Sequence, residues 1–283
     1  MNMHSETPAS SPLVSIVTPV LNEIKFIRQC VGSVLSQDYT RTEHIFVDGG
    51  STDGTEKVLM DYARANPARV VVITAIGSKP GDAWNIGLKA AKGDIFGCIG
   101  ADDICEPGAV YAAVDFFKSH PEASFLYGHC ELINEAGAVV GLNPAIPFNY
   151  KHFVNTTVPI STPSSYYRRA VMERIGWLDS SGDDFDAMCR IGRHYEMHTI
   201  DRVMSKLTLR ANSAFYSGSD FKRQKINYQQ TYLISRKYGG SPFSPLARRY
   251  YYGVLIDALR LQFAYPTLRR SFRKVRGIRS RTD

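Results

Sequence analysis

The chain has 283 residues, of which 44% are hydrophobic and 22% are charged. This is the composition of a globular protein, so disorder, collagen and coiled coil are excluded as the main state, and no apolar run approaches the ~20 residues of a membrane-spanning helix. The net charge of +7 comes from residues 245–283, which carry ten Arg or Lys and two Asp, so that the remaining 244 residues sum to −1.

The cysteines indicate a reduced protein. There are five of them, an odd number, and no CxxC pair occurs. A disulfide framework and a thiolate zinc site are therefore disfavoured, and a cytoplasmic location is expected. Residues 1–12 have neither a basic head nor an apolar stretch, so we expect a flexible lead instead of a signal peptide.

Strand and helix patterns alternate along the first half of the chain. Short apolar, β-branched runs predict strands, and apolar residues at helical spacing predict helices between them. The expected strands cover 14–19, 44–48, 70–75 and 95–99, and helices are expected from Glu23, after Gly54, over 82–91 and after Pro107. This order predicts right-handed βαβ units and a mostly parallel sheet.

Polar clusters follow three of these strands. Asn22 and Glu23 come after the first strand, Asp48 after the second, and Asp102 with Asp103 after the fourth. Parallel sheets bind ligands at the carboxyl ends of their strands, so these clusters predict a binding site at one edge.

The Asp102–Asp103 pair predicts a metal site. Two adjacent carboxylates repel each other unless a cation neutralises them, and hard divalent cations accept carboxylate oxygens. The alternative is a pair of helix N-cap residues, because Asp is favoured there.

The pattern changes after about residue 125. Residues 132–140 predict a hairpin with its turn at 134–137, and residues 141–165 predict a loop that lines a cleft. Residues 166–175 predict a helix, or a strand followed by a helix. The acidic segment 182–186 predicts the start of another helix, because its charges suit the helix dipole.

Four segments resemble family 2 glycosyltransferases, which are inverting enzymes with the GT-A fold. They are SIVTPVLNE at 15–23, VDGGSTDGT at 47–55, AWNIGLKAAKGD at 83–94 and ADD at 101–103. Each is weak alone, but the four occur in the family's order and spacing. The resemblance covers roughly residues 13–215.

The resemblance implies roles for the matching residues. Pro19, Asn22 and Glu23 would line the nucleotide pocket, and Asp48 would hold the base or its loop. Asp102 would bind a divalent cation, Mn²⁺ or Mg²⁺, with support from Asp103. The other residues expected at the donor are Lys79 and Asp82 near the nucleotide, and Asn85, which would order the loop.

The resemblance also implies a general base in the acidic segment. An inverting transferase needs a carboxylate that removes the proton of the acceptor hydroxyl. Asp184 matches the family pattern best, and Asp183 is the runner-up. The alternative is that Asp183, Asp184 and Asp186 only cap the helix.

Three positions depart from the family pattern. Gly49 replaces a second Asp after the second strand, which leaves uracil recognition open. Gly100 replaces the first acidic residue of the D-x-D motif, and so removes a ribose contact. Arg210 stands where many relatives carry a metal-binding His, and a fixed cation there could bind diphosphate directly.

Other site types are disfavoured. His194 and His198 would share a face of one helix, but no third zinc ligand accompanies them. No GxGxxG or GxxxxGK[ST] motif occurs, so a dinucleotide fold and a P-loop are not expected.

The C-terminal segment mixes aromatic, aliphatic and basic residues. Such a mixture suits the surface of an anionic membrane, and the alternative is a solvated helix that packs on the domain. Nucleic acid is not an expected partner, because no binding module accompanies the charge.

The sequence thus predicts a GT-A domain at 13–215, with a nucleotide half at 13–125 and an acceptor half at 126–215, and a helical basic extension at 216–283. The expected reaction moves a sugar from a nucleotide-sugar donor, a UDP-sugar being favoured, to a glycan or lipid-linked acceptor in surface polysaccharide synthesis. The protein would be cytoplasmic, or peripheral on the inner face of the membrane. The alternatives are a non-catalytic glycan- or nucleotide-binding partner of an assembly complex, and a metal-dependent nucleotidyltransferase.

Overall fold

A computed structural model of the chain describes residues 11–156, 160–176, 178, 184–210 and 221–258. The chain divides into two compact units. The first contains residues 1–133, 141–148 and 159–208, and the second contains residues 134–140, 149–158 and 209–283. The expected site lies in the first unit, except for Arg210.

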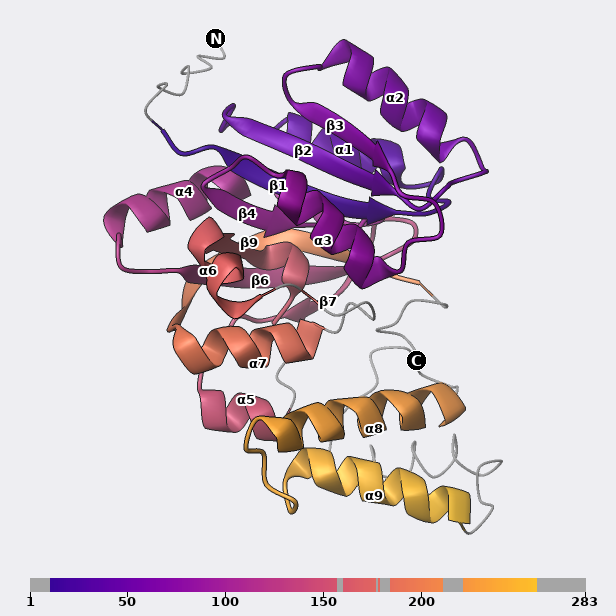
Figure 1. Cartoon of the computed structure of the whole chain (residues 1–283), viewed down its shortest axis with the longest axis vertical. Helices are drawn as coiled ribbons and strands as arrows, with labels where there is room; N and C mark the ends of the chain where they lie inside the picture. Colours follow the sequence, from indigo (N-terminus) through magenta and orange to yellow (C-terminus); the bar gives the residue numbers. More distant parts are fainter. Residues whose placement is uncertain (1–10, 157–159, 177, 179–183, 211–220, 259–283) are drawn as a thin grey trace. The chain divides into compact units, whose positions relative to one another are not determined.

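The described part of the first unit is built on one sheet (Figure 1). Its strands run in the order β3-β2-β1-β4-β8-β6-β9-β5, and β7 pairs with β6. The pairs β1–β2, β1–β4 and β2–β3 are all parallel, whereas β8 pairs antiparallel with both β4 and β6. The parallel strands are β1 (Val14–Val20), β2 (Thr42–Asp48), β3 (Val70–Thr74) and β4 (Ile95–Cys98).

Helices cover both faces of the parallel strands. α1 (Ile27–Leu35), α2 (Thr55–Ala65) and α4 (Ala109–Ser119) share one apolar cluster with β1 to β4. α3 (Pro80–Ala90) packs on the other face, where a Cβ on Gly87 would lie 2.3 Å from a methyl group of Val17. Glycine is therefore needed at position 87 for the close approach of helix and sheet.

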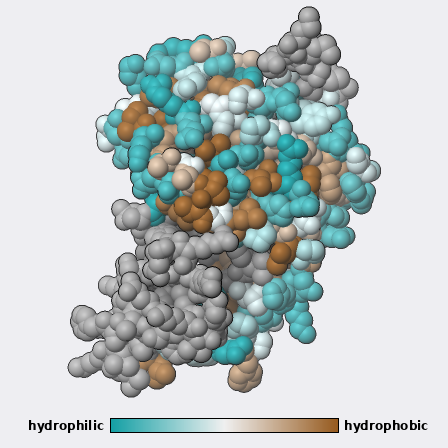
Figure 2. Space-filling model, turned by 180° about the vertical axis from the view of Figure 1, so that it is seen from behind, coloured by the Kyte–Doolittle hydropathy of each residue, from teal (hydrophilic) through white to brown (hydrophobic). Residues whose placement is uncertain are grey.

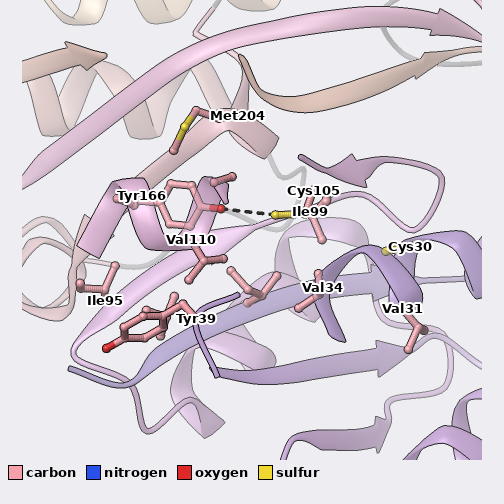
Figure 3. Packing of buried hydrophobic residues seen from close by; sticks show 14 of the residues in the cluster. Cys30, Val31, Val34, Tyr39, Ile95, Ile99, Cys105, Val110, Tyr166 and Met204 are labelled. Carbon is pink, nitrogen blue, oxygen red and sulfur yellow. Dashed lines mark hydrogen bonds between the residues drawn. The ribbon is translucent and has the colours of Figure 1, made fainter. Parts of the chain in front are cut away.

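Buried side chains of helices and strands meet in the main core (Figure 3). Tyr166 points from β8 toward Cys105, and its hydroxyl lies 3.6 Å from the thiol. All five cysteines are buried and free.

The remaining strands extend the sheet beyond β4. They are β5 (Ile104–Cys105), β6 (Phe125–Asn134), β7 (Val139–Asn143), β8 (Ser165–Arg168) and β9 (Met197–Leu209). The helical segments between them are η1 (Thr162–Ser164), α6 (Arg169–Ile175) and α7 (Asp184–His194). The expected strand-then-helix at 166–175 and the hairpin turn at 134–137 are confirmed, the latter by bonds from Gly137 to Asn134 and from Asn134 to Ala138.

The described part of the second unit consists of three helices and the hairpin turn at 134–140. It contains α5 (Tyr150–Thr156), α8 (Phe221–Lys237) and α9 (Pro245–Ala258). Ser235 of α8 donates a hydrogen bond of 2.5 Å to the carbonyl of Val154 in α5. Tyr232 packs against Leu246 and Ala247, which joins α8 to α9.

Three expectations are corrected by the structure. The loop expected at 141–165 contains α5 and η1. β1 continues through Pro19 to Val20, because β4 pairs with β1 only as far as Val17 and Pro19 has no ladder partner on that side. His194 ends α7 whereas His198 lies in β9, so the two do not share a helix face.

The described surface shows no membrane-spanning element. Seen from behind, apolar residues form several small patches among hydrophilic ones (Figure 2). Among the described residues, no helix is both long enough and apolar enough to cross a bilayer.

Candidate active site

Two loops at the carboxyl ends of β1 and β2 are joined by hydrogen bonds. The backbone N–H of Asn22 donates to Ser51 Oγ at 2.9 Å, and Asn22 Oδ1 accepts from the N–H of Thr52 at 2.8 Å. Asn22 has a φ of 55°, a left-handed conformation that Asn tolerates better than most residues. Asn22 therefore holds the wall of the expected nucleotide pocket in shape.

A second set of bonds joins the same loops. The N–H of Glu23 donates to Thr55 Oγ1 at 2.9 Å, and the N–H of Ile24 donates to Asp53 Oδ2 at 3.0 Å. Asp53 also accepts from the backbone and hydroxyl of Thr55. The four contacts along the two loops order them before any ligand binds.

Asp48 is fully buried and holds the turn that follows β2. Its carboxylate accepts from the hydroxyl of Ser51 at 2.5 Å and from the N–H of Ser51 at 3.2 Å. Two roles are expected for Asp48, namely holding the nucleotide base or holding the loop beside it. The contacts described here are with the loop. Pro19 lies half-buried in β1, beside Val47 of β2.

The turn after β4 places Asp102 and Asp103 differently. Asp102 is half-buried, whereas Asp103 is only 7% exposed and accepts a hydrogen bond of 3.0 Å from the N–H of Thr208. The hydroxyl of Thr208 donates to the carbonyl of Asp102. Asp103 thus connects the end of β9 to the turn, and Thr208, which contacts both acids, stabilises the backbone of Asp102.

Gly100 allows this arrangement. A Cβ at position 100 would lie 2.5 Å from Asp103 Oδ2 and 3.1 Å from Asp102 Oδ1. An aspartate in the first position of the motif would displace Asp103 from its buried place. The departure from the family pattern therefore has a steric reason in this chain.

Negative charge accumulates at this turn. Burial, followed by the charge of Asp102, raises the pKa of Asp103 to about 7, and the charge of Glu23 adds to the effect. The three carboxyl groups are therefore close enough to repel one another. A bound cation would relieve the repulsion, as would a proton on Asp103.

The residues at the turn fit a magnesium-like cation. In the part of the chain that the structure describes, no group of three His, Cys, Asp or Glu side chains could hold a metal ion by itself. Mg²⁺ sites on phosphate substrates use one or two protein carboxylates and take their other ligands from phosphate and water. Asp102 can serve as such a carboxylate, since Asp103 is engaged with Thr208.

Three residues expected at the donor lie in α3 or at its N-cap, and one of them, Asn85, belongs to the third motif. Lys79 is exposed at the N-cap, and Asp82 lies half-buried in the first turn. Asn85 bonds to the backbone of Leu178 in both directions, at 2.7 Å from Nδ2 to the carbonyl and at 3.0 Å from the Leu178 N–H to Oδ1. Asn85 therefore fixes the backbone of Leu178, and the loop role expected for Asn85 at the donor stays a prediction.

Asp184 is the first residue of α7 and is exposed. Its Oδ2 accepts a hydrogen bond of 2.7 Å from the hydroxyl of Thr162. Burial is the main cause that raises the pKa of the Cys98 thiol, and the charge of Asp184 contributes. Thr162 belongs to η1, which packs on β4, the strand that leads to Asp102, so Asp184 lies near this strand.

The other acids of this segment differ from Asp184. Asp186 is buried and forms an ion pair of 2.9 Å with Arg190, which also donates to the carbonyls of Ile175 and Gly176. Arg190 thus joins α7 to the end of α6, and Asp186 holds Arg190 in place. Asp183 lies outside the described residues.

Two participants were not expected from the sequence. Thr162 contacts the proposed base, and Thr208 contacts both members of the Asp pair. Both threonines lie in segments whose local structure the sequence did not predict. Arg210 directly follows β9 in the second unit, so its action on a diphosphate stays a prediction.

Comparisons with known proteins agree with this geometry. A sequence model described as Glycosyl transferase family 2 matches residues 15–175. Chondroitin synthase of Escherichia coli is 25% identical over 250 residues, which are 86% of this chain and 36% of that protein. The O-antigen biosynthesis protein RfbC of Myxococcus xanthus is 38% identical over 120 residues, or 41% of this chain and 9% of that protein. The chain therefore spans about a third or less of the length of these two relatives.

Solved structures show the same fold. The mannosyltransferase PcManGT from Pyrobaculum calidifontis, in complex with GDP-Man and Mn²⁺, has a TM-score of 0.60 at 16% identity, with 93% of this chain and 86% of that chain covered. S. aureus TarS 1-349 in complex with UDP-GlcNAc has a TM-score of 0.58 at 18% identity, with 80% and 71% covered. The expected α/β architecture of the GT-A type is thereby confirmed.

Proposed function

Because the chain belongs to glycosyl transferase family 2, whose sequence model covers more than half of it, we propose that this glycosyltransferase inverts the configuration of the sugar that it transfers. The donor is a nucleotide sugar, with a UDP-sugar as the first candidate. The acceptor is a hydroxyl group of a glycan or of a lipid-linked glycan.

The observation that supports this proposal is that two carboxylates belong to segments next to β4. Asp102 follows that strand in the chain, and Asp184 accepts a hydrogen bond from Thr162 of η1, which packs on the strand. We propose that Asp102 serves the diphosphate end of the donor and that Asp184 serves the acceptor, with the sugar bound between them.

Asp184 is proposed as the general base. It removes the proton of the acceptor hydroxyl while the oxygen attacks the anomeric carbon, the bond to the diphosphate breaks, and the nucleoside diphosphate leaves. Thr162 holds one carboxylate oxygen of Asp184 in place. Asp183 remains the runner-up for this role.

The departing diphosphate is the second requirement of the reaction. Asp102 would hold a divalent cation, Mn²⁺ or Mg²⁺, which when bound would offset the charge on the leaving group. Asp103 keeps Asp102 in position through the shared contacts with Thr208. The exposed Lys79 at the start of α3, and Arg210, supply fixed positive charge for the phosphates.

The relatives support a role in polysaccharide synthesis. Their names concern chondroitin and O-antigen, which are both glycans, so a growing surface polysaccharide is the proposed acceptor. Such an acceptor, if lipid-linked, would be met at the inner face of the membrane. We propose that the basic residues of 245–283 hold the cytoplasmic protein there as a peripheral protein.

A panel of nucleotide sugars tests this function. Calorimetry with and without Mn²⁺ should find one donor whose affinity depends on the metal, and that donor should yield the nucleoside diphosphate when acceptor is added. Release of pyrophosphate would indicate a nucleotidyltransferase. Metal-dependent binding without hydrolysis or transfer of any donor would favour a non-catalytic binding partner.

A further inference from the structure

We propose that the turn between α8 and α9 is a contact site for anionic lipid, in which Phe243 enters the apolar part of a bilayer and Arg248 binds a lipid phosphate. The site lies wholly in the second unit and in described residues. It shares Arg248 with the basic residues of 245–283 proposed above for membrane contact, and it deepens that proposal by naming the side chains that meet the lipid; the basic cluster at 269–276 lies outside the described residues. It does not rest on the transfer reaction.

The turn is ordered by its own contacts. Gly239 has a φ of +88°, and a Cβ on Gly240 would lie 2.0 Å from Ser235 Oγ, so both positions require glycine. The N–H of Ser241 donates to Asn155 Oδ1 at 2.7 Å, and Ser244 caps α9 through a bond of 3.1 Å from the N–H of Ala247. Phe243 stands between these fixed points and is nevertheless 85% exposed.

The helix pair exposes several large apolar side chains. Among the residues whose burial the structure describes, the apolar cluster between α8 and α9 contains the buried residues Tyr232, Leu246 and Ala247, with Tyr250 partly buried against them. The large apolar residues left exposed on this pair and its turn are Leu233, Phe243, Tyr251, Val254 and Leu255. An exposed apolar group of this kind, set among cations, is typical of a surface that meets a membrane or a partner.

A hollow of about 610 Å³ lies beside the turn. It is lined by Pro242, Phe243, Arg248 and Tyr251. Arg248, Tyr251 and Leu255 follow each other at helical spacing on one face of α9, and the hydroxyl of Tyr251 lies 3.0 Å from that of Tyr232. A guanidinium group next to two fixed aromatic rings can bind a phosphate and the apolar chain attached to it at the same time.

The positive charge of this surface favours anionic lipid over a second copy of the chain as its binding partner. Residues 228–255 contain four Arg or Lys and no Asp or Glu. The four are exposed, namely Arg236, Lys237, Arg248 and Arg249. Two such surfaces would repel each other, whereas an anionic bilayer attracts each cation near its surface by about 1 kcal/mol.

Sedimentation of the full chain with vesicles tests the proposal. Wild-type protein should bind vesicles of equal parts phosphatidylglycerol and phosphatidylcholine, and should bind pure phosphatidylcholine far less. Phe243→Ser should weaken binding about tenfold, because one aromatic anchor is lost. Arg248→Gln should weaken it about fivefold at low salt, and less at high salt.

Tyr111→Ser is the matched control, since Tyr111 is 55% exposed on α4 of the first unit. Its vesicle affinity should equal that of the wild type, and all variants should melt like the wild type because the replaced side chains are exposed. The proposal is overturned if the wild type does not bind anionic vesicles, if Phe243→Ser binds them as tightly as the wild type, or if Tyr111→Ser loses as much vesicle affinity as Phe243→Ser. A dimer that Phe243→Ser dissociates, without anionic lipid binding, would assign the surface to a second copy.

Discussion

Removing the side-chain amide of Asn85 should affect both stability and turnover. Asn85→Ala deletes the two hydrogen bonds to the backbone of Leu178, at 2.7 and 3.0 Å. Each is worth about 1 kcal/mol, so the free energy of unfolding should fall by about 2 kcal/mol. For a unit of this size the melting temperature should fall by about 4–8 °C.

Turnover should fall as well, because Leu178 lies six residues before Asp184 in the chain. Loss of its anchor loosens the segment that leads to the proposed base, and misplacement of a catalytic group by about 1 Å can lower the rate by about 100-fold. Asn85→Asp should behave similarly, since its carboxylate would face the carbonyl of Leu178. Thermal melts and kcat at saturating donor measure the two effects.

Asn66→Ala is the control for this prediction. Asn66 is the C-cap of α2, at the end of that helix opposite to Asp53 and Thr55, and donates one side-chain bond of 3.1 Å to the carbonyl of Tyr62. It should cost about 1 kcal/mol of stability and leave kcat unchanged. If Asn85→Ala also left kcat unchanged, Asn85 would stabilise the fold without holding the proposed general base in position.

Three further variants test single side chains of the site. Asp102→Asn should keep the fold and abolish most of the Mn²⁺ dependence of donor affinity in calorimetry, whereas Asp115→Asn on the exposed face of α4 should not. Asp103 keeps its proton in the folded state up to about pH 7, so the contribution of this carboxyl group to the free energy of unfolding falls as the pH rises from about 4 to 7. Thermal melts in chelator should therefore show that the melting temperature of Asp103→Asn rises relative to that of the wild type over this pH range. Asp186→Ala should lower the free energy of unfolding by about 2 kcal/mol, because the ion pair with Arg190 is lost. It should leave kcat unchanged, because Arg190 keeps its two carbonyl partners. An unchanged melting curve would contradict the ion pair.

Local patterns in the sequence were sufficient for the parallel part of the sheet. Continuous apolar runs predicted β1 to β4 because β1, β2 and β4 are buried on both faces, whereas β3 at the edge of the sheet is partly exposed. Helical spacing predicted α1 to α4 because each buries one face. The placement of the polar clusters followed from the rule that carboxyl ends of parallel strands share an edge.

Contacts between distant segments could not be read in this way. β9 was missed because it is partly exposed along its length and mixes charged with apolar residues, and β5 has only two residues. Thr162 and Asp184 are 22 residues apart, and Asn85 and Leu178 are 93 apart. Such pairs depend on how the elements pack, which periodicity does not encode.

The assignment of individual carboxylates shows the same limit. The sequence places Asp183, Asp184 and Asp186 in one acidic segment with nothing to separate capping from catalysis. The structure gives Asp186 a partner in Arg190 and gives Asp184 a place near β4. These tertiary contacts give Asp186 a structural role, and the choice of Asp184 over Asp183 as the general base stays a proposal, because Asp183 lies outside the described residues.

The transfer rate of Asp184→Asn tests this account most directly. The change keeps an oxygen that can accept from Thr162, so folding and donor affinity should survive. Turnover onto the acceptor should fall by about 10²–10⁴-fold, because the proton acceptor is lost. Asp183→Asn, measured in parallel, should lose far less. Near-normal transfer by Asp184→Asn with intact donor binding would contradict the assignment, and a large loss at Asp183 alone would move the base by one residue.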